Sequence, residues 1–89
     1  SVAEELARAI TKLPQGSMVY VLISTADPKL PGVVREAVGR GLRVLVLGYN
    51  PQDYVPSKKH ARLPSLAEEY LGEVSTMGAT VVSVPYTAI

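Results

Sequence analysis

Cysteine is absent from the 89-residue sequence, and histidine occurs once, at His60. The lack of cysteine excludes disulfides and every metal site built on thiolates, and it is typical of proteins from reducing compartments. A single imidazole also leaves little room for metal binding or catalysis that depends on histidine. Thiolate sites are thus excluded, and imidazole chemistry is nearly so.

Phenylalanine and tryptophan are absent as well, so the five tyrosines are the only aromatic residues. The usual platforms for stacking nucleic-acid bases are therefore scarce. Nine basic and eight acidic residues give a net charge of +1, which supplies no overall field toward nucleic acid or an anionic membrane. Any binding of that kind would have to come from a local basic patch.

Long hydrophobic runs are missing too. No apolar run approaches the ~18 residues of a membrane span, and the chain start lacks the basic region and apolar core of a signal peptide. Because 47% of the residues are hydrophobic and 19% charged, the chain is too apolar for a disordered segment. We expect one small soluble domain, residues 1–89, in the cytoplasm. It begins at Ser1 rather than Met, as a domain excised from a longer chain would.

A helical pattern, a glycine and a β-rich run follow one another three times along the chain. The glycines are Gly16, Gly41 and Gly78. Glycine suits the end of a helix because it adopts positive φ angles without steric cost. This order predicts three helix-strand units.

The expected helices cover residues 2–13, 31–40 and 65–77, and the expected strands cover residues 18–23, 43–49 and 80–84. The third helix is expected to begin at Ser65, whose spacing to Glu68 is that of a capping box. The first strand is apolar at every position, which is typical of a strand covered on both faces. We therefore expect it at the centre of the sheet.

Strands joined through helices form parallel pairs with right-handed crossovers, and the helices then cover the sheet faces. We predict an α/β fold, a three-layer Rossmann-like unit with a three-stranded parallel sheet. Three strands leave two open edges. A protein partner or a second copy of the chain is expected to cover them.

Polar residues follow two strands at the sheet edge where ligands bind in open parallel sheets. The candidates are Ser24, Thr25 and Asp27 after the first strand, and Asn50 and Asp53 after the second. Their oxygens suit a hard divalent cation such as Mg²⁺ or Mn²⁺, with Asp27 as a ligand, or a small polar molecule. The same residues equally suit turns and helix caps. The ligand site is therefore a hypothesis, and no cofactor is assigned.

Residues 50–64 contain three prolines and a basic cluster of Lys58, Lys59, His60 and Arg62. Ammonium and guanidinium groups neutralise phosphates, so the lysines and the arginine are candidate contacts for a phosphate or an RNA backbone. A cluster of this kind is also ordinary solvated surface. The chain has neither a phosphate-binding glycine loop after its first strand nor a G-x-S-x-G elbow, so the usual nucleotide sites and hydrolase sites are not expected.

The stretches Val19–Asp27 and Val33–Val46 resemble the second half of a divergent prokaryotic von Willebrand factor A domain. Residues 1–87 follow that family's order of helix, glycine turn, apolar strand, aspartate, helix, turn and strand. The resemblance implies that Asp27 matches the acidic residue that closes the family's metal-ion-dependent adhesion site. The family's D-x-S-x-S stretch belongs to an earlier strand and is absent here. Our leading hypothesis is therefore a non-catalytic module that binds a protein or another ligand.

The stretches Leu22–Asp27 and Gly41–Gly48 are also similar to the NYN branch of PIN-like ribonucleases. In that family the strand runs into a turn that supplies metal-binding carboxylates. The alternative hypothesis is thus a metal-dependent ribonuclease, or an inactive relic of one. It would use Asp27 and Asp53, with the loop from Lys58 to Arg62 on RNA.

Overall fold

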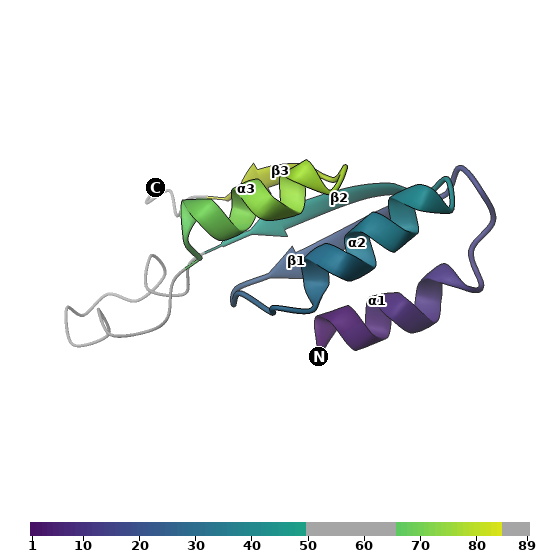
Figure 1. Cartoon of the computed structure of the whole chain (residues 1–89), viewed down its shortest axis with the longest axis horizontal. Coiled ribbons are helices and arrows are strands. Elements are labelled where there is room, and N and C mark those ends of the chain that lie inside the picture. Colours follow the sequence, from purple (N-terminus) through teal and green to yellow (C-terminus); the bar gives the residue numbers. More distant parts are fainter. Residues whose placement is uncertain (50–65, 85–89) are drawn as a thin grey trace, which may run out of the picture.

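The computed structural model describes residues 1–49 and 66–84 (Figure 1). Helices α1 (Val2–Ile10), α2 (Leu30–Gly39) and α3 (Glu68–Thr76) alternate with strands β1 (Met18–Ile23), β2 (Arg43–Gly48) and β3 (Thr80–Ser83). The predicted α/β class and the order helix-strand, repeated three times, are confirmed.

The three strands form one parallel sheet in the order β1-β2-β3. Met18 pairs with Arg43 at the start of β1, and Ile23 pairs with Gly48 at its end. The central strand is therefore β2, and β1 lies at an edge, so the prediction that the first strand is central was wrong. An uninterrupted apolar run shows that a strand has two apolar faces, and this does not require two neighbouring strands.

The helices lie together on one face of the sheet (Figure 1). Each crossover moves one strand further in the same direction, so two right-handed crossovers place α2 and α3 on the same side. Helix α1 packs against α2 in this layer. The described residues therefore form two layers, and the third layer that we expected is not built by them.

The core lies between the helices and the sheet. Strand side chains alternate between the two faces, and those that face the helices are buried, as Val21, Ile23 and Val46 show. Helix α2 contributes Leu30 and Val34, which are fully buried. No charged or polar residue belongs to the buried class within residues 1–49 and 66–84. The stability of the domain thus comes from one apolar layer.

Glycines end the three helix-to-strand turns, as the sequence predicts. Gly16, Gly41 and Gly78 have φ angles of 90°, 86° and 107°. At Gly78 a Cβ atom would also lie 3.0 Å from Cγ1 of Val38. Both the backbone angle and the space at this turn therefore require glycine.

Two helices are shorter than the sequence indicates. Helix α1 ends at Ile10, because Pro14 disfavours helical backbone in the residue before it and the chain must turn toward β1. Helix α3 begins at Glu68, and its N-cap is Ala67 in an extended conformation, with no side-chain cap. The predicted start at Ser65 was therefore wrong.

Candidate functional site

The face of the sheet opposite the helices is apolar and faces solvent. It consists of Met18, Tyr20 and Leu22 from β1, Leu45 and Leu47 from β2, and Val82 from β3 with Val84 beyond it. We call this surface the open face. Tyr20 is 66% exposed and Leu22 is 61% exposed, so large hydrophobic side chains lie in water there.

The strand register makes the open face continuous. Tyr20 lies beside Leu45, whose neighbour on β3 is the polar residue Thr80. In the next row Leu22 lies beside Leu47, which in turn lies beside Val82. The one charged residue within the three strands is Arg43, at the start of β2. The apolar rows are therefore uninterrupted by charge.

Exposure of this face to water is unfavourable. Each square ångström of apolar surface left in water forgoes about 25 cal/mol, and parallel sheets occur almost only where both faces are covered. Contiguous apolar patches of this kind mark surfaces that bind proteins, membranes or apolar ligands. The open face is therefore a candidate binding surface.

A groove runs along the outer edge of β1, between that strand and α1. Its volume is about 350 Å³, and its lining consists of Val2, Glu5, Leu6 and Ala9 from α1 with Val19, Tyr20, Val21 and Leu22 from β1. Figure 1 shows α1 on the outer side of β1, away from β2. Within the described part of the chain, β1 pairs with β2 alone, so the groove follows an unpaired strand edge.

Asp27 lies in the loop that joins β1 to α2. Its Oδ1 atom accepts a hydrogen bond from the amide of Lys29 at 2.9 Å. Its carbonyl oxygen accepts from the amide of Leu30 at 3.2 Å and from the hydroxyl of Tyr70 at 2.5 Å. Asp27 therefore joins the loop to the first turns of both α2 and α3.

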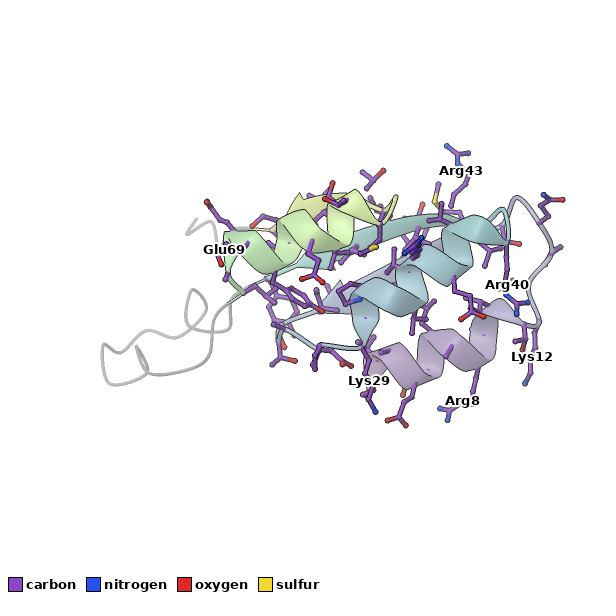
Figure 2. The ribbon with its side chains drawn as sticks, viewed as in Figure 1. Arg8, Lys12, Lys29, Arg40, Arg43 and Glu69 are labelled. Atoms are coloured by element: carbon purple, nitrogen blue, oxygen red, sulfur yellow. The ribbon has the colours of Figure 1, made fainter. Side chains whose placement is uncertain are left out.

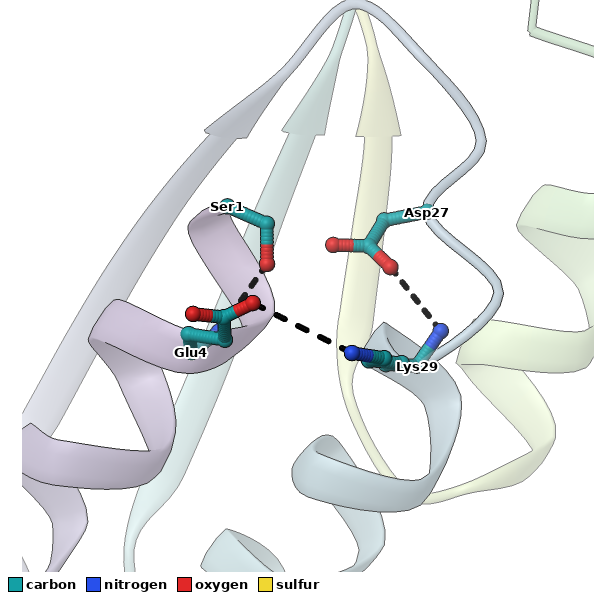
Figure 3. A network of polar contacts seen from close by, with 4 residues as sticks. All are labelled: Ser1, Glu4, Asp27 and Lys29. Carbon is teal, nitrogen blue, oxygen red and sulfur yellow. Dashed lines mark hydrogen bonds and ion pairs between the residues drawn. The ribbon is translucent and has the colours of Figure 1, made fainter.

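Helix α1 also begins beside this loop. Ser1 caps α1 by accepting from the amide of Glu4 at 3.3 Å, and Oε1 of Glu4 lies 3.9 Å from Nζ of Lys29 (Figure 3). Both side chains of this ion pair are more than half exposed, so its contribution to stability is small. The starts of three helices thus meet around Asp27.

The amide of Lys29 lowers the pKa of Asp27 below its ordinary value of 3.8, and burial partly opposes this effect. The Ser1 hydroxyl and the Ala3 amide also favour the carboxylate, although neither meets the geometry of a hydrogen bond to Oδ2. Within the described residues, Oδ2 is buried and accepts no hydrogen bond. The carboxylate is therefore ionised at neutral pH.

Tyr70 is the second titratable group at this loop. Burial raises the pKa of its hydroxyl, and the nearby charges of Asp27 and Glu73 act in the same direction. The hydroxyl therefore keeps its proton at neutral pH and donates a hydrogen bond to the Asp27 carbonyl. The contacts of Asp27 are those of a residue that holds helices together.

The structure describes only some of the other residues of the predicted ligand site. Ser24 is half-buried and Thr25 is exposed, and both lie in the same loop as Asp27. Asn50, Asp53, Lys58, Lys59 and Arg62 lie outside the described residues. In residues 1–49 and 66–84, no group of three acidic or histidine side chains could hold a metal ion. The metal role of Asp27 stays a prediction.

The contribution of Asp27 to stability should depend on pH. Its folded-state pKa is lowered, so this contribution is present above the unfolded-state pKa and is lost as pH falls through the folded-state value. Urea unfolding of the wild type should show a falling free energy between about pH 5 and pH 3. Asp27→Asn should show a shallower fall, and identical slopes in the two proteins would contradict this account.

Comparison of the chain with family models, curated proteins and solved structures found no match. The resemblances to von Willebrand factor A domains and to NYN ribonucleases therefore stay predictions. Of the helices that the structure describes, none has the length and apolar character needed to cross a bilayer. The open face was not foreseen from the sequence, because it depends on the described helices lying on one side of the sheet. Open sheet edges were expected, but not that β1 would form one of them beside α1.

Proposed function

We propose that this domain is a non-catalytic protein-interaction module and that the open face is its interface. The observation that supports this function is the apolar character of the side of the sheet that faces solvent, where Tyr20 and Leu22 are more than half exposed. Parallel sheets need cover on both faces. The helices of this domain cover one face, and the partner covers the other.

The partner surface that fits the open face is an amphipathic helix. Three strands about 4.8 Å apart make a face roughly 14 Å wide, which matches one helix of about 10–12 Å diameter. Six residues of strand span about 20 Å, the length of about 14 helical residues. A helix with one apolar stripe would therefore cover the apolar rows from Met18 to Val82.

Charge gives this helix a direction. Arg43 lies where β2 begins, and Figure 2 shows it at the end of the domain opposite Glu69. The carboxyl end of a helix carries partial negative charge. The bound helix should therefore place its last turn at Arg43 and run antiparallel to the strands.

A second copy of the chain is the alternative occupant of the open face, because two apolar sheet faces can also cover each other. Self-association remains a measurable outcome and is distinguished from helix binding below.

The test is a titration followed by fluorescence anisotropy. The probe is a labelled helical peptide of about 14 residues with leucines at i, i+3, i+4 and i+7 and glutamates in its last turn. The patterned peptide should bind in the micromolar range, and a scrambled peptide of the same composition should not. Light scattering that shows a dimer without peptide binding would assign the face to a second copy. If the protein stays monomeric and does not bind the patterned peptide, the proposed function is contradicted.

Matched arginine variants test the direction of the helix. Arg43→Glu should weaken binding of the peptide that ends in glutamates and strengthen binding of one that ends in lysines. Arg40→Glu makes the same charge change at the same end of the domain, but at the end of α2 on the helix side. It should change neither affinity.

A further inference from the structure

The backbone of β1 alternates between its paired and its unpaired side. The Ser17 carbonyl accepts from the amide of Arg43 at 2.9 Å, and the Ile23 carbonyl accepts from the amide of Tyr49 at 3.0 Å. Because backbone groups change side at every residue of a strand, odd-numbered residues of β1 face β2. The amides and carbonyls of Met18, Tyr20 and Leu22 therefore point outward, away from the sheet.

These outward groups lie beside the groove under α1. Helix α1 packs against α2 rather than squarely on β1, and it lies beyond the edge of the strand (Figure 1). The groove between them is lined mainly by small and medium apolar side chains, such as Val2, Ala9 and Val21. Among residues 1–49 and 66–84, a strand edge without a neighbouring strand and an apolar hollow thus occupy the same place.

We infer that the outer edge of β1 accepts an extended segment of a partner protein as a fourth strand, with apolar side chains of that segment in the groove. Strand addition supplies main-chain hydrogen bonds to the edge, while pockets select alternate side chains. This inference goes beyond the proposed function, because the open face binds through side chains and the edge binds through the backbone.

The geometry also specifies the chemistry of the segment. A helix cannot satisfy the edge, because its own backbone groups are already bonded to one another. A second copy that paired with this edge would place its own helices in the space that α1 already occupies beyond β1, so the two copies would clash. Glu5 is the charged residue in the lining of the groove. The segment should therefore be extended, apolar at alternate positions, and basic at the position that faces Glu5.

Backbone methylation gives a sharp test. The probe is a blocked peptide of about eight residues that alternates valine and threonine, with one central lysine. Two isomers carry N-methyl groups on the odd or on the even amides, so that only one isomer loses the donors that face β1. The unmethylated peptide and one isomer should bind, and the other isomer should bind at least about tenfold more weakly. Equal binding of the two methylated isomers would overturn the inference, and so would failure of the unmethylated peptide to bind.

Charge variants identify the groove. Glu5→Lys should lower the affinity for the lysine peptide by about threefold to tenfold and raise that for a glutamate peptide. Glu69→Lys makes the same change on α3, far from the groove (Figure 2), and should leave both affinities unchanged. Equal effects of the two variants would show only a general attraction between net charges and would overturn the inference.

Hydrogen exchange shows whether the edge of β1 is occupied by the peptide, by the chain itself or by a second copy. The amides of Tyr20 and Leu22 should exchange freely in the isolated monomer and become protected when the peptide is added. Protection in the monomer alone would mean that the chain itself fills the edge, and protection that grows with protein concentration would mean a second copy. Either result would overturn the inference. If the extended peptide does not bind but the helical peptide does, this inference fails and the proposed function of the open face stands. If the extended peptide binds but the helical peptide does not, the proposed function fails and this inference stands.

Discussion

Val82→Glu should weaken binding of the patterned helical peptide at least about tenfold, because burying a valine side chain contributes about 1.5 kcal/mol and a buried unpaired carboxylate costs more. Val82 is 42% exposed on the open face, so the substitution should leave the fold intact. Val82→Thr keeps the shape and should give a smaller loss. The measurement is the anisotropy titration, with circular dichroism to verify folding.

Leu13→Glu is the matched control for this prediction. Leu13 is 38% exposed, close to the value for Val82, but it lies in the turn between α1 and β1. The introduced carboxylate has the same charge and lies outside the open face. Equal losses of affinity in Val82→Glu and Leu13→Glu would show that the peptide does not bind the open face.

Leu30→Ala should lower the free energy of unfolding by about 2–5 kcal/mol. Leu30 is fully buried at the start of α2, so the substitution removes apolar contacts and leaves a cavity. Domains of this size are stable by only about 5–15 kcal/mol. The change should therefore move the urea midpoint far toward lower concentrations.

Leu13→Ala is the control for the core, and it should lower the free energy of unfolding by only about 1 kcal/mol, because Leu13 is 38% exposed. Leu30→Met nearly conserves volume and should cost less than about 1.5 kcal/mol, so it stays measurable even if Leu30→Ala does not fold. Similar effects of the alanine variants at positions 13 and 30 would contradict the placement of the core.

The fold class was predictable from the sequence because its signals are local. Gly16, Gly41 and Gly78 mark the three turns through their own backbone angles, and a local preference needs no knowledge of distant residues. The bounds of β1 were predicted correctly for the same reason. The start of α3 was not, because the capping-box spacing at Ser65 is a local preference that the surrounding structure did not follow.

The layers could not be predicted in this way. Val21 and Leu22 are neighbours with equally apolar side chains, yet Val21 is buried and Leu22 is 61% exposed. A sequence records that a face is apolar but not which element covers it. The order β1-β2-β3 with right-handed crossovers places α2 and α3 on one side of the sheet, and α1 lies in the same layer (Figure 1). The other apolar side is left exposed.

The candidate site was predictable only in part. Ser24, Thr25 and Asp27 lie in one loop after β1, as their positions in the sequence indicate, and a ligand role for them stays a prediction. The hydrogen bond from Tyr70 joins residues 43 positions apart, so no local pattern could indicate it. The groove likewise depends on where α1 lies relative to β1, which follows from its packing on α2.

The most direct test of the open face is site-specific photo-crosslinking from a benzophenone side chain placed at Val82, with the same group at Leu13 as control. The experiment uses an extract of the cells that make the protein, and mass spectrometry identifies the crosslinked segment. The account predicts crosslinks from position 82 to an amphipathic helical segment of another protein, and few from position 13. Equal crosslinking from the two positions, or none from position 82 in a monomeric protein, would contradict it.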